Sequence, residues 1–138
     1  MRAYLAPWSP QLLSILRMVT GFLFIAHGTQ KWFSFPAPSE QAVELMSSVG
    51  VAGTLELVGG ALMILGLFTR LTAFILSGLM AFAYFIAHAP NGFWPILNRG
   101  ELAALYSFVF LYFAVAGAGE WSLDRWLGMR RWNEQFAS

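Results

Sequence analysis

Long runs without charge dominate the pattern of hydrophobic and polar positions along this chain. Glu56 is the only charge in the second of these runs, the first contains only Arg17 and His27 as ionisable residues, and the last two contain none. A helix that crosses a bilayer needs roughly 20 residues, at a rise of about 1.5 Å per residue. The pattern therefore predicts an all-α membrane protein with four spans. The runs are residues 11–29, 49–69, 71–87 and 102–119.

Proline and glycine place the ends of these helices. Pro10 suits the first turn of the first span, the segment 35–38 ends that span, and the segment 90–95 forms a loop. Ser39 is expected to cap a short amphipathic helix on the membrane surface, whose apolar stripe is Ala42, Val43, Met46 and Val49. Helices joined by short turns pack as antiparallel neighbours, so residues 1–138 are expected to form a single up-down-up-down transmembrane four-helix bundle. The expected spans are about residues 10–33, 51–68, 71–88 and 100–118.

A short internal match suggests an alternative description of the bundle. Residues 24–27 and 85–88 have the same sequence, Phe-Ile-Ala-His, and each is followed by a loop and a helix with Glu-Leu, at 56–57 and 101–102. A parallel 2+2 repeat would pair the two histidines and the two glutamates about an axis along the membrane normal. Chance similarity in so apolar a chain is the other interpretation.

Basic residues predict the orientation of the spans. Most of them fall on the side that holds both termini, and the positive-inside rule then places both termini in the cytoplasm of a bacterial inner-membrane protein. These residues are Arg2, Arg70, Arg125, Arg130 and Arg131. Tryptophans are expected to mark the two interfaces, with Trp8, Trp121, Trp126 and Trp132 on the inner side and Trp32 and Trp94 on the outer side.

Composition narrows the chemistry. Of the 138 residues, 58% are hydrophobic and 11% charged, against roughly a quarter charged in a soluble domain. A net charge of +1 argues against nucleic acid as a partner. The absence of cysteine excludes iron–sulfur ligation and thiolate nucleophiles, and no haem or flavin signature is visible. Redox chemistry would thus require a bound cofactor, a quinone or a partner protein.

The first span carries its polar groups on one face. Arg17, Gly21, Gly28 and Lys31 share a helical stripe with His27 at its edge, and pointing Arg17 at lipid would cost roughly 2.5–3.5 kcal/mol, so this face should point into the bundle.

Glu56 is expected at the depth of His27, so a partnership of Glu56 with His27 or Lys31 is geometrically natural. Arg17 lies roughly 15 Å further in. Its expected partner is a set of helix-end carbonyls, Asp124 or a phosphate headgroup. Asp124 itself is expected to cap and anchor the terminal helix.

Polar residues from all four spans are expected at the outer end of the bundle. They allow three interpretations: hydrogen bonds that fix helix register, a quinone site in which His and Lys donate to a carbonyl while Glu exchanges a proton, or a metal site. The metal site is not expected, because the Glu-x-x-His spacing of di-iron bundles is missing. This outer polar cluster is His27, Lys31, Glu56, His88, Asn91, Asn98, Arg99 and Glu101.

Four sequence blocks resemble the DoxX family of small bacterial membrane proteins. They are residues 16–31 with Ala-His-Gly and Gln-Lys, residues 56–70 with Glu-Leu-Val-Gly-Gly, residues 98–103, and residues 117–124 with Gly-Ala-Gly-Glu-Trp-Ser-Leu-Asp. The resemblance implies a four-helix protein of the cytoplasmic membrane, and links to thiosulfate:quinone oxidoreductase subunits and to oxidoreductase complexes of oxidative or thiol stress. Arg99, between Asn98 and Glu101, departs from the usual Asn-Gly-Glu of the family and adds positive charge at the outer mouth.

These observations give a working hypothesis, a quinone-interacting subunit of a membrane oxidoreductase. His27 and Glu56 would be its catalytic proton-handling pair, and its ligand-binding residues would be Arg17, Lys31, His88, Asn98 and Glu101. The alternatives are a non-catalytic scaffold that recruits a soluble redox enzyme and a small transporter or proton path, so enzyme status stays open. Expected partners are membrane lipid, a soluble oxidoreductase and a second copy of the chain.

Overall fold

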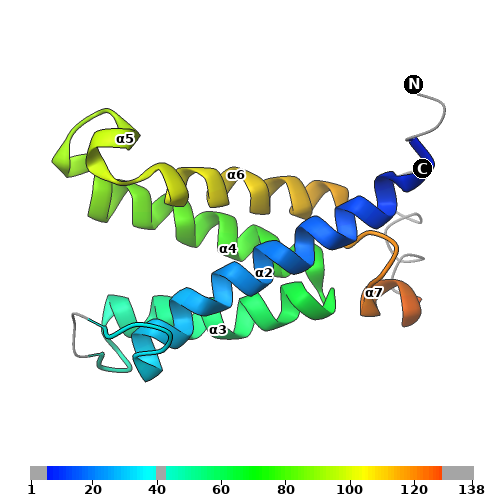
Figure 1. Cartoon of the computed structure of the whole chain (residues 1–138), viewed down its shortest axis with the longest axis horizontal. Coiled ribbons are helices and arrows are strands. Elements are labelled where there is room, and N and C mark those ends of the chain that lie inside the picture. The colour runs from blue at the N-terminus through cyan, green and yellow to red at the C-terminus, as the bar shows by residue number, and fades with distance from the viewer. Residues whose placement is uncertain (1–5, 40–42, 129–138) are drawn as a thin grey trace. The chain divides into compact units, whose positions relative to one another are not determined.

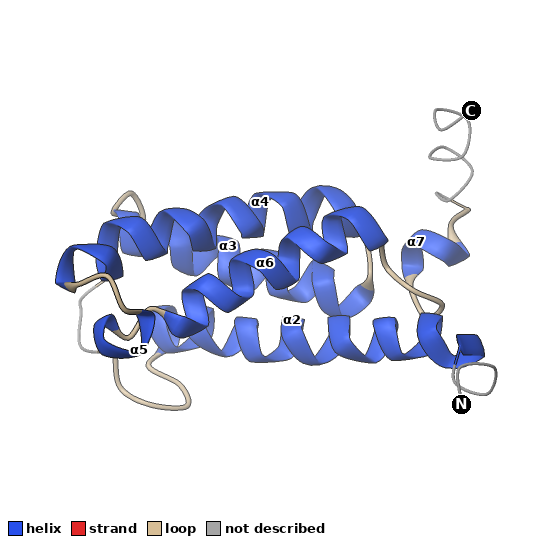
Figure 2. Cartoon of the chain, turned by 90° about the horizontal axis from the view of Figure 1, so that it is seen from above, coloured by secondary structure: helices blue, strands red, loops and turns tan. Residues whose placement is uncertain are grey.

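The computed structural model describes residues 6–39 and 43–128, and every regular element in these ranges is a helix (Figures 1 and 2). The all-α prediction is therefore confirmed. The elements are the 3₁₀ helix η1 (Ala6–Trp8), α2 (Ser9–Phe33), α3 (Ser48–Leu65), α4 (Thr69–Ala83), the π-helix η2 (Tyr84–His88), the 3₁₀ helix η3 (Ala89–Asn91), α5 (Pro95–Asn98), α6 (Glu101–Ala116) and α7 (Leu123–Trp126).

Three helical stretches in the described residues are long and apolar enough to cross a membrane: Ala6–Phe33, Ser48–Leu65 and Thr69–Asn91. The fourth expected span, α6, is apolar but has only 16 residues. The described residues separate into two compact units, one within residues 6–69 and 118–128 and the other residues 70–117. The four-helix bundle and the 2+2 repeat stay predictions.

Helix boundaries follow local signals. α2 begins one residue before Pro10 and ends at Phe33 as expected. α3 starts and ends three residues earlier than expected, because the Ser47 hydroxyl caps it by accepting from the amide of Gly50 at 3.0 Å, and Gly66, with φ +66°, ends it in the left-handed conformation. The third span changes from α-helix to π-helix at Tyr84.

The amphipathic helix expected after Ser39 is wrong for the residues that can be described. Val43 to Ser47 form a loop and turn, in which the Ser47 amide and hydroxyl both donate to the Glu44 carbonyl, at 3.0 and 2.7 Å. This closed turn leads directly into the cap of α3, and Met46 of the expected apolar stripe is 90% exposed. Glu40 to Ala42, and likewise Arg2, Arg130, Arg131 and Trp132, lie outside the described residues.

In the first unit, α2 and α3 pack backbone to backbone. A Cβ atom built on Gly21 would lie 2.9 Å from the Gly60 carbonyl oxygen, and one built on Gly60 would lie 3.0 Å from the Gly21 carbonyl oxygen. Close approach of this kind maximises van der Waals contact, which replaces the hydrophobic effect as the force between helices in lipid. The glycines of this pair therefore set the distance between the two helices.

In the second unit, side chains of α4 bind carbonyl groups of α6. The Ser77 hydroxyl donates to the Ser107 carbonyl at 2.8 Å. Arg70 donates to the carbonyls of Ala114, at 3.1 Å, and Val115, in the last turn of α6, and its guanidinium lies against Gly117, whose φ is +86°. These bonds satisfy carbonyls that a helix end leaves without an intrahelical partner.

We expect Gly60→Ala to destabilise the protein by about 1–3 kcal/mol, because the added methyl group must push α2 and α3 apart. Gly78→Ala in α4 is the matched control, since a Cβ there meets nothing within 4 Å and alanine favours the helix. Unfolding by added SDS in a mild detergent measures both. Equal midpoints for the two variants would contradict the close packing.

Candidate functional site

A buried ion pair joins the last turn of α2 to α3. The Lys31 Nζ atom lies 2.5 Å from both carboxylate oxygens of Glu56, and the Glu56 side chain is 4% exposed against 28% for Lys31. Glu56 is the only charged residue in α3. Because an unpaired carboxylate is costly in apolar surroundings, the ammonium group of Lys31 is what allows Glu56 to be buried there.

Of the two partners considered for Glu56, the ion pair is made by Lys31. His27 is half-buried and lies four residues before Lys31 on α2, so the imidazole and the ammonium group share one face of that helix, one turn apart. The part assigned to His27 in proton handling stays a prediction.

Arg17 is fully buried, and its guanidinium binds four backbone carbonyls. It donates to Ala118 at 2.8 Å, to Trp121 at 2.5 Å, to Ile64 at 2.8 Å and to Met63. Helix-end carbonyls were one of the three expected partners, and Asp124, another, interacts with the guanidinium electrostatically. This arrangement favours a structural role for Arg17 over binding of a lipid headgroup.

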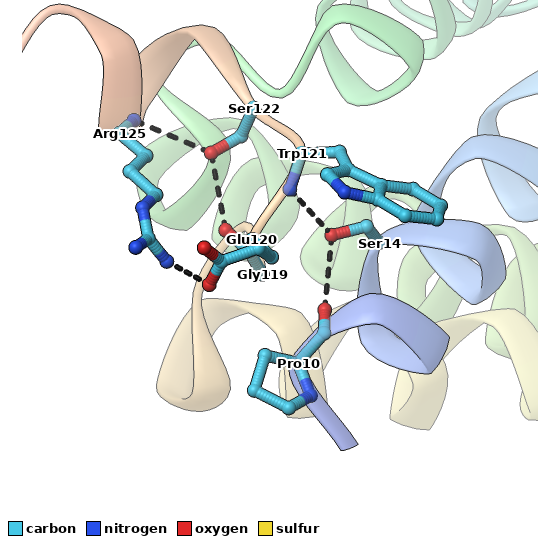
Figure 3. A network of polar contacts seen from close by, with 7 residues as sticks. All are labelled: Pro10, Ser14, Gly119, Glu120, Trp121, Ser122 and Arg125. Carbon is cyan, nitrogen blue, oxygen red and sulfur yellow. Dashed lines mark hydrogen bonds and ion pairs between the residues drawn. The ribbon is translucent and has the colours of Figure 1, made fainter. Parts of the chain in front are cut away.

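A polar network fixes residues 119–125 to the start of α2 (Figure 3). The Ser14 hydroxyl donates to the Pro10 carbonyl and accepts from the Trp121 amide, both at 3.0 Å, and the Glu120 amide donates to the same Pro10 carbonyl at 3.1 Å. Glu120 also forms an ion pair with Arg125. Sequence reasoning missed Ser14, although its position three residues before Arg17 on the same helical face was a usable signal.

Asp124 has a different role from the one expected. Ser122 caps α7, by accepting from the Arg125 amide at 3.3 Å. The Asp124 carboxylate instead accepts from the amides of Phe68 and Thr69, at 2.7 and 2.9 Å, at the start of α4. A carboxylate suits this place because a helix N-terminus presents free amide donors and a positive dipole end. The prediction that Asp124 caps the terminal helix is therefore wrong.

The second unit holds the other members of the predicted cluster. Asn98 is 4% exposed, and its side chain donates to the Gly92 carbonyl at 2.8 Å and accepts from the Gly100 amide at 2.8 Å. The His88 Nδ1 atom lies 3.1 Å from the Asn98 carbonyl oxygen. Glu101 is exposed in the first turn of α6, where its charge suits the helix dipole.

The structure thus brings together Lys31 with Glu56, and His88 with Asn98, each pair within one unit. In the described residues, no group of three or more His, Cys, Asp or Glu side chains could hold a metal ion. What the arrangement offers chemically is a charged donor and acceptor in the first unit and an imidazole of fixed orientation in the second.

We expect Lys31→Met to destabilise the protein more than Glu56→Gln. The lysine variant leaves an almost fully buried carboxylate unpaired, whereas the glutamine variant leaves an ammonium group that is partly exposed and can reach the interface. The double variant should recover part of the loss, by about 1 kcal/mol or more. Detergent unfolding midpoints of the three variants measure this, and additive effects would show that the pair is not coupled.

We expect Arg17→Met to cost several kcal/mol, because several buried carbonyls lose their donor at about 1–3 kcal/mol each, although the Met63 carbonyl keeps the Gly66 amide. Arg17→Lys should recover only part of this, since an ammonium group lacks the planar fork of donors. Arg125→Met is the matched control, an exposed arginine with a single ion-pair partner. A shared unfolding midpoint for the variants at 17 and 125 would rule out this role.

The sequence is similar to a known family model and to proteins of several bacteria. The family model DoxX matches residues 12–89, a range that includes Arg17, the Lys31–Glu56 pair and His88. An uncharacterized protein of Haemophilus influenzae is 48% identical, over 87% of this chain and 93% of its own length. An uncharacterized membrane protein of Mycobacterium tuberculosis is 30% identical, over 88% of this chain and 84% of its own.

A protein of Bacillus subtilis named "Putative oxidoreductase CatD" is 26% identical, over 80% of this chain and 82% of its own length. No solved structure matches the chain. The family model covers more than half of the chain, and the Haemophilus influenzae protein matches most of both lengths. Together with its long apolar helices, these matches show that the chain is a membrane protein of the DoxX family.

Proposed function

We propose that this protein is a subunit of a bacterial inner-membrane oxidoreductase that works at the level of quinone, and that the Lys31–Glu56 pair handles protons there. The ion pair itself carries the proposal: both carboxylate oxygens lie 2.5 Å from the ammonium nitrogen, between helices that are otherwise almost free of charge. Intramembrane ionisable residues are functional candidates by default. The name of the Bacillus subtilis relative supports the reaction class.

Proton handling fits what this chain contains. Reduction of a quinone to hydroquinone consumes two electrons and two protons. Without cysteine, and without a haem or flavin signature, the chain is assigned the protons, and the electrons come from a partner oxidoreductase that carries a redox cofactor. Lys31 is the more exposed member of the pair and suits donation to a quinone oxygen. His27 and Glu56 would then relay a proton from the aqueous phase to the neutral lysine, because the carboxylate of the ion pair holds no proton of its own.

The proposed placement in the membrane follows from the basic residues. With both termini in the cytoplasm, the carboxyl end of α2 and the Lys31–Glu56 pair face the extracytoplasmic side. Arg70 and Arg125 then lie on the cytoplasmic side. Exposed apolar side chains of the long helices, such as Phe22, Val58 and Phe74, contact lipid in this arrangement.

Glu56→Gln tests the proposal, since it keeps the shape of the side chain and removes its charge. In membranes from a deletion strain complemented with the variant, quinone-dependent electron transfer should fall by about 100-fold or more, as for loss of a general acid or base. The amount of folded protein, measured by gel filtration in a mild detergent, should stay near that of the wild type.

Glu44→Gln is the matched control, the same chemical change at an exposed carboxylate, and should leave the rate unchanged. Full electron transfer in a folded Glu56→Gln protein would reject the proton role and favour a scaffold that recruits a soluble redox enzyme. Loss of folded protein in Glu56→Gln, with a normal rate per remaining molecule, would show that the pair only fixes helix register.

A further inference from the structure

An imidazole in the second unit is held in one tautomer. The Nδ1 atom of His88 lies 3.1 Å from the backbone carbonyl oxygen of Asn98. A carbonyl oxygen only accepts, so Nδ1 carries the hydrogen and donates it. In a neutral imidazole the second nitrogen, Nε2, then has a lone pair and no hydrogen. His88 therefore presents a hydrogen-bond acceptor on the side of the ring that faces away from Asn98.

The carbonyl that fixes the ring is itself firmly positioned. The Asn98 side chain is 4% exposed and binds both sides of its own loop, with the Gly92 carbonyl and the Gly100 amide each at 2.8 Å. It also donates to the Tyr84 hydroxyl at 3.4 Å. The loop between η3 and α6 is therefore folded around Asn98, and the acceptor for His88 belongs to that anchored residue.

The helix that carries His88 is distorted where the ring is placed. The Ala89 amide donates to the Tyr84 carbonyl, five residues back, in the wider π-helical turn. Pro90 follows, and because it has no amide hydrogen it makes no α-helical bond to Ile86. The Tyr84 and His88 rings are stacked, with centroids 6.5 Å apart and an angle of 27° between planes. Tyr84 thus supports the imidazole from one face.

The second nitrogen of this ring, Nε2, is left for a ligand. Within the described residues, Nε2 has no hydrogen-bond partner, and His88 is half-buried. Most of the exposed residues near His88 in the sequence are apolar, with Asn91 as a polar exception. The large apolar ones are Phe85 and Ile86 on the π-helix, and Phe93 and Trp94 in the loop that Asn98 folds. A free acceptor on a segment rich in exposed aromatic and aliphatic side chains fits an apolar ligand with a hydroxyl donor.

We infer that His88 Nε2 is a binding site for the phenolic hydroxyl of a membrane-soluble molecule, with hydroquinone as the ligand that the proposed function would provide. The choice of hydroquinone rests on that proposed function, whereas the tautomer of His88 does not. A quinone has only carbonyl acceptors on its ring, so this site distinguishes the reduced from the oxidised form. The site is thus assigned the hydroquinone, and not the quinone.

Nitrogen-15 NMR of histidine-labelled full-length protein in lipid nanodiscs tests the inference. The chain has two histidines, so His88→Gln assigns the signals of His88 by their loss. In a buffer of about pH 8.5, wild type without ligand should show Nδ1 protonated and Nε2 unprotonated. Decylubiquinol, added anaerobically, should shift the Nε2 signal in a saturable way, whereas decylubiquinone should not.

Three results would overturn the inference. A protonated Nε2 in the ligand-free protein would contradict the assigned tautomer. An Nε2 signal that does not shift with decylubiquinol would show that hydroquinone does not bind there. Equal shifts with decylubiquinol and decylubiquinone would show that the site does not distinguish hydroquinone from quinone. The first of these results uses no quinone, and Glu56→Gln leaves His88 unchanged, so failure here and failure of the proposed proton role are told apart.

Discussion

The first unit depends on the hydrogen bonds that the Arg17 guanidinium donates to four backbone carbonyls. The carbonyls at the end of α3 have no partner within their own helix, and an apolar surrounding offers no water to replace one. Arg17 donates to two of these carbonyls and, with its remaining groups, to Ala118 and Trp121. One side chain thus joins α2, the end of α3 and the chain that follows α6.

Charge is balanced locally in this unit. Arg17 interacts with Asp124, whose carboxylate is itself held by amides at the start of α4, and Lys31 forms its ion pair with Glu56. The two basic residues are 14 positions apart on α2, which is about 21 Å along the helix. α2 therefore carries two compensated charges, one at Arg17 and one in its last turn, and the apolar stretch between them is free to pack through glycine.

Sequence periodicity predicted the parts of this arrangement that lie on one helix. The stripe from Arg17 to Lys31 follows from 3.6-residue spacing. The start of α2 follows from Pro10, and the Lys31 alternative for Glu56 from the depth expected along each helix. The roles of Ser14 and Asp124 did not, because their partners are backbone groups more than fifty residues away. Spacing along one helix carries no information about such distant amides and carbonyls.

Local signals also explain the boundary errors. The expected amphipathic helix had the right apolar spacing, but the turn at Ser47 starts α3 and interrupts it. The π-helical turn before Pro90 could not be predicted, because an apolar sequence is equally compatible with an α-helix and a π-helix. What His88 contacts then depended on the fold of the loop around Asn98, which no periodic pattern encodes.

Arg70 repeats in the second unit what Arg17 does in the first. Each arginine lies on the first helix of a hairpin, donates to the last carbonyls of the second helix and lies against the glycine that follows them, Gly66 or Gly117. In a hairpin of this design, the arginine can bind the last carbonyls of the second helix as soon as both helices have been synthesised. The partners of Arg70 all lie within residues 70–117, whereas the first hairpin gains the last two partners of Arg17 only when Ala118 and Trp121 have been synthesised.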